Sequence, residues 1–165
     1  MSNEYQIIYI SEKTSEFEAD RDLNKITSAS FRNNNARDVT GVLMYNGGFF
    51  FQVIEGKKED VIYTYNKIIL DPRHQNVNLL SDREIEHRSF ENWPMALIKL
   101  SDVDLDVIDH VVAWNDLIND SRKHEPISED KIDRLIEALR YKISLYLQSL
   151  SHHLGLALVD SLVDL

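Results

Sequence analysis

The order of segments in the first hundred residues predicts an α+β fold with a ferredoxin-like β-α-β-β-α-β(β) sheet. Three observations support this class. Short runs rich in β-branched and aromatic residues alternate with helix-like segments, a double glycine joins two of the runs, and the central runs are apolar on both faces. Two helices cover one face of such a sheet. A C-terminal helical extension is therefore expected to pack on the other face.

The predicted strands are short runs dominated by isoleucine, valine, phenylalanine and tyrosine. They span residues 5–11, 39–46, 49–55, 77–86 and 96–100. Gly47 and Gly48 lie between the second and third runs, and glycine accepts the positive φ of a tight turn at low cost. These two runs are therefore expected to form a hairpin.

The two predicted helices of the sheet domain span residues 18–36 and 57–70. Asparagine favours helix ends, so the cluster Asn33-Asn34-Asn35 is expected to terminate the first helix. Asp71-Pro72 terminates the second, because the residue before a proline disfavours the helical region. The residues of the second helix expected to face inward are Val61, Tyr65, Ile68 and Ile69.

In this plan the first and third strands are neighbours at the centre of the sheet, and successive side chains alternate between its faces. The helix-facing side is expected to carry Ile7, Tyr9, Ser11, Phe50, Gln52 and Ile54. The opposite side carries Ile8, Ile10, Phe51 and Val53. The second set is wholly apolar and needs its own cover.

The C-terminal part supplies apolar stripes for that cover, so the chain is divided into residues 1–101 and an extension at 102–165. A helix is expected at 103–119, with Val107, Ile108, Val111, Trp114 and Ile118 on one face. A second begins after Ser128 as N-cap and carries, in near-heptad spacing, Ile132, Ile136, Leu139, Ile143, Tyr146 and Leu150. The tail LGLALVDSLVDL is apolar enough to need a docking surface.

Composition excludes several classes of protein. The net charge of −10 argues against a general binder of nucleic acid or of membrane surfaces, both of which require a basic face. The chain has no cysteine, which excludes disulfides, thiolate catalysis and cysteine-bound zinc. The chain shows neither a signal peptide nor an apolar run of membrane length, so a cytoplasmic location is expected.

Two polar residues interrupt apolar strands at positions that are predicted to be adjacent, Tyr9 and Gln52. A buried glutamine left unmatched costs roughly 1–3 kcal/mol, so it needs partners. One interpretation is a tyrosine–glutamine pair that stabilises the core. The other is a ligand site, since carboxamides at Asn33 and Asn34 can pair with an imide edge and Ile26 faces Ile68 across a gap suited to a flat ring.

The segments YIS, RNNNARDVTGVLMYNGGFFFQVIEG, DPRH and FENWPM resemble the BLUF family of flavin-adenine-dinucleotide blue-light sensors over residues 5–100. The resemblance implies that Tyr9 is the photoactive tyrosine and that Gln52 is the switching glutamine between it and the flavin ring. Asn33 and Asn34 match the pair that binds the pyrimidine edge of the ring. FAD is the implied cofactor, with FMN as the alternative.

The resemblance also assigns the remaining site residues. Ile26 and Ile68 match the aliphatic residues that sandwich the ring, with Ser30 near it. The positions lining the ribityl and phosphate side match Lys67, Asp71 and His74, and the mobile pair before the last strand matches Trp93 and Met95. Three positions depart from the family pattern. Asp38 stands where glycine is common, Pro94 stands where a small polar residue is frequent, and Asn35 extends the asparagine pair to a triplet.

The implied mechanism is electron and proton transfer from Tyr9 to excited flavin and back, which leaves Gln52 with altered hydrogen bonds and shifts the flavin absorption to the red. The signal is expected to reach a separate protein partner, and a homo-oligomer is expected. Two alternatives are a non-photoactive ferredoxin-like enzyme and a pure assembly module. The enzyme is disfavoured because none of the six histidines has metal-site spacing or an evident carboxylate partner. The assembly module is disfavoured because a heptad stripe of this width more often packs within its own chain.

Overall fold

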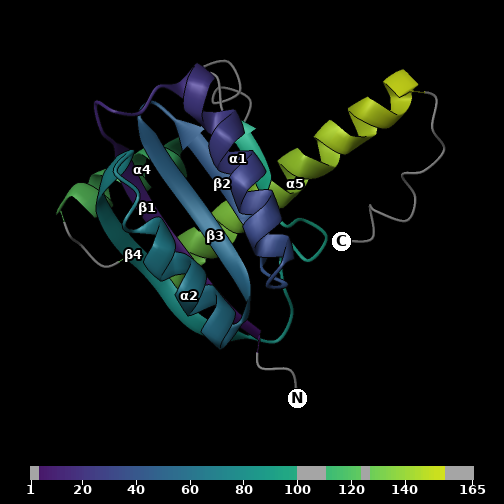
Figure 1. Ribbon diagram of the computed structural model, residues 1–165. Helices are drawn as coiled ribbons and strands as arrows, with labels where there is room; N and C mark the ends of the chain where they lie inside the picture. The colour runs from purple at the N-terminus through teal and green to yellow at the C-terminus, as the bar shows by residue number, and fades with distance from the viewer. Residues whose placement is uncertain (1–3, 100–110, 124–126, 155–165) are drawn as a thin grey trace.

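The computed structural model describes residues 4–99, 111–123 and 127–154. Its five-stranded sheet has the order β4-β1-β3-β2-β5 (Figure 1). Neighbouring strands are antiparallel except β2 and β5, which run parallel. The strands are β1 (Glu4–Lys13), β2 (Thr40–Asn46), β3 (Phe49–Lys57), β4 (His74–Ile85) and β5 (Ala96–Lys99). The predicted ferredoxin-like sheet, with its first and third strands at the centre, is confirmed.

The first two helices, α1 (Ala19–Asn35) and α2 (Lys58–Ile68), cover one face of the sheet (Figure 1). Their buried residues join the helix-facing side chains of the strands in one apolar cluster. It includes Ile7, Leu23, Val39, Phe50, Ile54 and Val61. Side-chain alternation along the strands therefore places the expected set of residues on this face.

Helix ends differ slightly from the predicted ones, and one inward residue was predicted wrongly. Asp38, just beyond α1, has a φ of +52°, in the left-handed region that glycine occupies most easily. This is the conformation that glycine, the residue expected there from the resemblance, adopts without strain. Ile69 was expected to face inward, but it is 40% exposed because α2 ends at Ile68 and the chain turns there.

The predicted hairpin between β2 and β3 is confirmed. Gly47 and Gly48 have φ values of +56° and +89°, so both occupy the region that the favoured two-residue hairpin turns require. The turn fixes the register of the two strands, in which Leu43 lies opposite Gln52.

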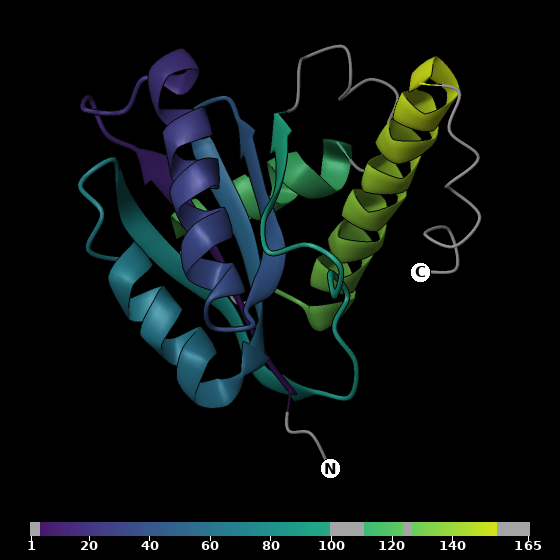
Figure 2. The ribbon, with the colours of Figure 1, turned by 45° about the vertical axis from the view of Figure 1, so that its right-hand side comes forward.

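Two further helices, α4 (Val111–Lys123) and α5 (Glu129–Leu154), pack on the opposite face (Figure 2). The apolar back of the central strands forms one core with them. Its members include Ile8, Ile10, Phe51 and Val53 from the sheet and Leu117, Ile118, Ile132, Leu135, Ile136 and Leu139 from the helices. The extension therefore covers the back of the sheet, as predicted.

Only the first half of α5 lies on the sheet. After Leu139 the helix extends past the sheet (Figure 2), and Tyr141 and Leu145 are exposed. The predicted heptad stripe is buried as far as Leu139 and continues into the partly buried Ile143. The side chains of Val111, Trp114, Tyr146 and Leu150, together with residues 103–110 and the tail at 155–165, lie outside the described residues.

A buried polar network crosses the back of the sheet, and the sequence did not reveal it. The carboxylate of Glu55 on β3 accepts hydrogen bonds from Gln6 Nε2 (2.7 Å) and from the backbone N–H of Phe90 (2.9 Å). Gln6 in turn accepts from Arg83 Nε (3.0 Å), and Arg83 pairs with Asp133 of α5 (2.8 Å). Burial raises the pKa of Glu55, while these donors partly oppose the rise. The network ties β3 to the segment before β5 and to α5.

No helix in the described part of the chain combines the length and the apolar composition needed to cross a bilayer.

Candidate flavin site between the first two helices

The centre of the site is a pair of side chains on neighbouring strands. Tyr9 of β1 and Gln52 of β3 lie directly opposite each other in the antiparallel register. Both side chains are buried, at 2% and 3% exposure. The Tyr9 hydroxyl donates a hydrogen bond to Oε1 of Gln52. The contact predicted from strand alternation is therefore present.

The other end of the Gln52 carboxamide faces Met95. Its Nε2 lies 3.7 Å from the Met95 sulfur. A thioether is a weak acceptor, so this contact satisfies little of the donor capacity of the amide group. Gln52 thus spans from Tyr9 to Met95 and keeps donor capacity for a further partner.

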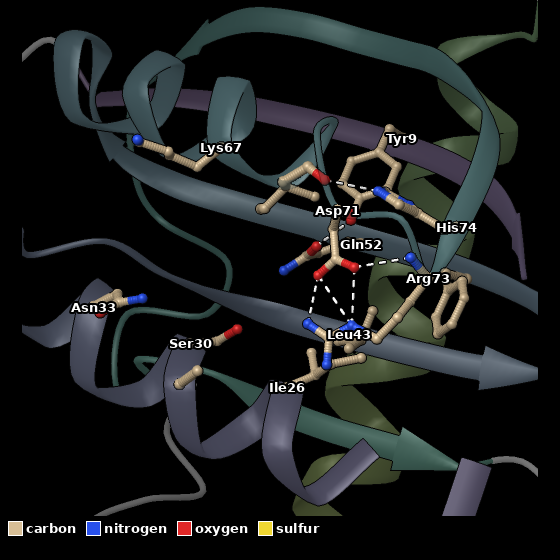
Figure 3. Close-up of a pocket in the computed structure, with 13 residues that line it drawn as sticks. Tyr9, Ile26, Ser30, Asn33, Leu43, Gln52, Lys67, Asp71, Arg73 and His74 are labelled. Carbon is tan, nitrogen blue, oxygen red and sulfur yellow. Dashed lines mark hydrogen bonds and ion pairs between the residues drawn. The ribbon is translucent and has the colours of Figure 1, made fainter. Parts of the chain in front are cut away.

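A cavity of about 210 Å³ opens beside this pair, between α1 and α2 (Figure 3). Ser30 and Asn33 of α1 lie across it from Lys67 of α2, with Gln52 at its back wall. Nine of the ten residues predicted to bind the cofactor line the cavity. They are Tyr9, Ile26, Ser30, Asn33, Gln52, Lys67, Ile68, Asp71 and His74.

Asn34, the tenth residue, is placed differently. It is 2% exposed, and its Nδ2 donates to the carbonyl oxygen of Pro94 (2.8 Å) rather than lining the cavity. Asn33, one residue earlier, does line the cavity, and within the described part of the chain its amide has no hydrogen-bond partner. Asn33 thus lines the cavity, whereas its neighbour Asn34 binds the segment before β5. Direct binding of a ligand by Asn34 stays a prediction.

The polar end of the cavity is built by the sequence Asp71-Pro72-Arg73-His74 at the start of β4. Arg73 Nε donates to Asp71 (2.9 Å), and this hydrogen bond holds the pKa of the Asp71 carboxyl below its usual range. His74 Nε2 lies 2.7 Å from the carbonyl oxygen of Ile68, and its Nδ1 lies 2.9 Å from the Ser11 hydroxyl. A carbonyl can only accept, so Nε2 carries a proton and the ring orientation is fixed.

The lining of the cavity includes a cation that suits an anionic ligand group. Arg73 is neutralised by Asp71, whereas Lys67 is exposed at the rim and has no carboxylate partner among the described residues. A phosphate that approached the rim would meet the ammonium group of Lys67, whereas both ring nitrogens of His74 are already engaged by Ile68 and Ser11. The other wall, with Ile26 and Ile68, is apolar and suits a flat ring.

The two residues predicted as the mobile pair point to different places. Met95 is buried against Gln52, whereas Trp93 is partly exposed and lies beside α5. The backbone between them is held through carbonyl groups, because Trp93 accepts from the N–H of Gly41 (2.8 Å) and Pro94 accepts from Asn34. Neither bond needs an N–H from Pro94, which explains how proline fits this segment.

Gly41 makes this attachment possible. A Cβ at this position would lie 2.0 Å from the carbonyl oxygen of Val53, so only glycine fits between the strands there. Its N–H then reaches the carbonyl of Trp93.

Four residues that line the cavity were missed by sequence reasoning. They are Ala29, Leu43, Phe50 and Arg73. Leu43 could have been predicted from the sequence, because the hairpin register places it opposite Gln52. Arg73 lies inside a recognised segment, but its salt bridge with Asp71 depends on a local turn that residue types alone do not define.

Burial also affects the pKa of Tyr9, the candidate photoactive residue. The absence of water around Tyr9 raises the pKa of its phenol far above the usual value, and the nearby Tyr65 and Asp71 add to the rise. The phenol therefore stays protonated throughout the physiological pH range. Its proton remains on the hydrogen bond to Gln52.

Comparison with known proteins gives a consistent result. The model of a family described as sensors of blue light using FAD, BLUF, matches residues 5–96. The blue light- and temperature-regulated antirepressor BluF of Escherichia coli (strain K12) is 36% identical over 105 residues, which cover 61% of this chain and 26% of that protein.

Solved structures agree in fold. A bacterial light-regulated adenylyl cyclase has a TM-score of 0.64 and 32% identity, covering 73% of this chain and 35% of that one. BlrB, a BLUF protein in its dark state, has a TM-score of 0.71 and 24% identity, covering 86% and 98%. The chain thus spans only about a quarter to a third of the antirepressor and of the cyclase.

Proposed function

The chain belongs to the BLUF family of blue-light sensors that use FAD, and from this premise we propose that the cavity between α1 and α2 holds the flavin ring and that Tyr9 and Gln52 form its light switch. The observation that carries the proposal is the line of contacts from Tyr9 through Gln52, which both line the cavity, to Met95 behind them. Light absorption and acceptance of an electron are the chemistry that bound flavin would supply.

The residues present fit such a ring. Ile26 and Ile68 offer apolar surface on the two helices, and the Asn33 amide and the Gln52 Nε2 offer donors near the cavity. The exposed Lys67 at the rim supports a phosphate-bearing flavin. We propose FAD rather than FMN, in agreement with the family description.

Within this site Tyr9 supplies the proton, and Gln52 transmits the change in its hydrogen bonding to Met95. The phenol is neutral because burial raises its pKa, and the acceptor in contact with it is Oε1 of Gln52. A proton that leaves Tyr9 and later returns passes this carboxamide. If the carboxamide settles in a different arrangement, its contact with Met95 changes with it. The segment before β5 then receives the signal.

The first prediction tests the proposal as a whole. The purified protein should carry oxidised flavin that is released on denaturation, identified as FAD by chromatography. Blue light should shift its visible absorption to longer wavelength, and the shift should reverse in darkness. Protein that stays colourless after refolding with excess flavin would remove the basis of the proposal.

The second prediction concerns Asn34→Ala. Loss of the bond to Pro94, and of the ring contact that we propose for this carboxamide, should weaken flavin binding about fivefold or more, since such a bond contributes about 1 kcal/mol. The measurement is the dissociation constant of flavin from the refolded protein. Asn35→Ala is the matched control, because Asn35 is the exposed neighbour at the end of α1. Equal dissociation constants in the two variants would contradict the role of Asn34.

We propose further that residues 1–101 form the photosensory part and residues 102–165 its helical extension, and that the chain is a sensor rather than an enzyme. Relatives in the family include a light-regulated antirepressor and a light-regulated cyclase. By analogy, output should reach a partner protein, and we propose a homo-oligomer in the cytoplasm as the acting form. Light-dependent retention of a partner on immobilised protein tests the first of these points.

A further inference from the structure

Glu55 is a buried carboxylate on the strand that carries Gln52. It lies three residues after Gln52 on β3, so side-chain alternation places it on the opposite face of the sheet. It is fully buried, and its oxygens accept hydrogen bonds from Gln6 Nε2 (2.7 Å) and from the backbone N–H of Phe90 (2.9 Å). A carboxylate offers about four acceptor positions, so Glu55 can accept from another donor as well.

The bond to Phe90 fixes the start of the segment that ends at Met95. Trp93 donates its backbone N–H to the carbonyl oxygen of Phe90 (3.0 Å), which closes a turn. At the other end of the segment, the Met95 sulfur lies 3.7 Å from Nε2 of Gln52. Strand β3 therefore contacts this segment at both ends, through Glu55 at its start and through Gln52 at its end.

A buried hydroxyl without a partner lies beside this carboxylate. Thr40 of β2 is directly opposite Glu55 in the antiparallel register, so the two side chains are neighbours on one face, with Cβ atoms about 4.5–5.5 Å apart. Thr40 is 5% exposed, and among the described residues its Oγ1 has no hydrogen-bond partner. Buried hydroxyls are normally bonded, because an unmatched one destabilises the fold. The unused donor therefore requires an explanation.

One explanation is that Thr40 only fills space between the strands. The other is that its hydroxyl has a partner in a second arrangement of the protein, and Glu55 is the neighbouring charged acceptor. If the N–H of Phe90 moved away, the buried carboxylate would lose a donor. The Thr40 hydroxyl could replace it by a rotation about χ1. Glu55 would then keep its number of hydrogen bonds, so the two arrangements would be close in energy, as a bistable element requires.

We propose that the Phe90 N–H and the Thr40 hydroxyl are alternative donors to Glu55, and that these residues position the segment before β5 in the two states of the light switch. We assign the structure to the dark arrangement, in which Glu55 holds Phe90. When the contact between Gln52 and Met95 changes, the segment shifts, Phe90 leaves Glu55 and Thr40 donates instead. This inference rests on the proposed light switch, because it assigns the step that follows the change at Gln52.

Thr40→Val tests the proposal, with Thr40→Ser as the matched control. Valine keeps the branched shape and removes the hydroxyl, whereas serine keeps the hydroxyl and removes the methyl group. With valine the red shift should keep its size, because Tyr9 and Gln52 are unchanged, but the lit arrangement loses a hydrogen bond. Its return to the dark spectrum should therefore be about fivefold faster or more, whereas the serine variant should return within about twofold of the original rate.

The order of the two variants should reverse when stability is measured on flavin-free protein. The midpoint of urea unfolding should stay the same or rise with valine, because the hydroxyl that it removes has no partner among the described residues. The midpoint should fall with serine, because a buried methyl group is lost. A purely structural role of Thr40 would not separate the return rate from the stability in this way.

The carboxylate itself can be followed by infrared spectroscopy. Exchange of one donor for another should shift the carboxylate stretching band of Glu55 in the light-minus-dark spectrum. This signal should be absent from Glu55→Gln and altered in Thr40→Val. A signal that persists in Glu55→Gln, or that is identical in Thr40→Val and the original protein, would overturn the exchange of donors.

The other outcomes separate this inference from the proposed function. A red shift of normal size, with return rates that agree within about twofold between the valine and serine variants, would overturn this inference alone. A lower urea midpoint with valine would show that the Thr40 hydroxyl already has a partner in the dark, and would also overturn it. Absence of the red shift from the original protein would remove the proposed function, and this inference with it.

Discussion

Replacing Tyr9 by phenylalanine should abolish the light-induced red shift while flavin remains bound. The substitution keeps the ring that lines the cavity and packs in the core, and it deletes only the hydroxyl that donates to Gln52. Without that group no proton can leave residue 9, and Oε1 of Gln52 loses its donor. The visible difference spectrum, light minus dark, should therefore be flat at a flavin content close to that of the original protein.

Tyr65→Phe is the matched control for this prediction. The Tyr65 ring lies 5.7 Å from that of Tyr9, between ring centroids, but Gln52 is bonded to Tyr9 and not to Tyr65. This variant should keep a normal red shift. A shift of normal size in Tyr9→Phe would show that Tyr9 serves only the core. Gln52→Leu should lose the shift as completely as Tyr9→Phe, because it removes the carboxamide that connects Tyr9 to Met95.

The sequence allowed the strand layer to be predicted in detail, because side-chain alternation is a strict consequence of strand geometry. Once residues 5–11 and 49–55 were identified as neighbouring strands, alternation placed Gln52 and Phe51 on opposite faces, and the expected register placed Tyr9 on the face of Gln52. The structure confirms both placements. The hairpin at Gly47-Gly48 was equally accessible, since few residue types accept its backbone conformation.

Features that depend on contacts between distant loops could not be predicted from the sequence in the same way. The amide of Asn34 binds Pro94, 60 positions away in sequence, and nothing in either residue type selects the other. The directions of Met95 and Trp93 follow from which helix or strand meets each side chain. Glu55 resembles an exposed end of a strand in the sequence, yet it is fully buried because Gln6 and the backbone of Phe90 satisfy it.

The second large effect is expected at the back of the sheet, where α5 packs on β1 and β3. Leu139→Asp should lower the free energy of unfolding by about 4 kcal/mol or more, because it places an unpaired carboxylate in the core with Ile8, Phe51 and Val53 and removes apolar burial. Urea unfolding followed by circular dichroism measures this loss. Binding of a dye specific for exposed apolar surface should rise at the same time, since the strands lose their cover.

Leu145→Asp is the control that separates this contact from the intrinsic properties of the helix. It makes the same chemical change on the same helix, six residues later, where α5 has left the sheet and the side chain is 42% exposed. Its effect should stay within about 0.5 kcal/mol. If both variants lost stability equally, the cost would arise from aspartate in the helix and not from the interface. If neither did, α5 would not be part of the cooperative core, and a signal from Gln52 on β3 would have to leave by the segment that carries Trp93 alone.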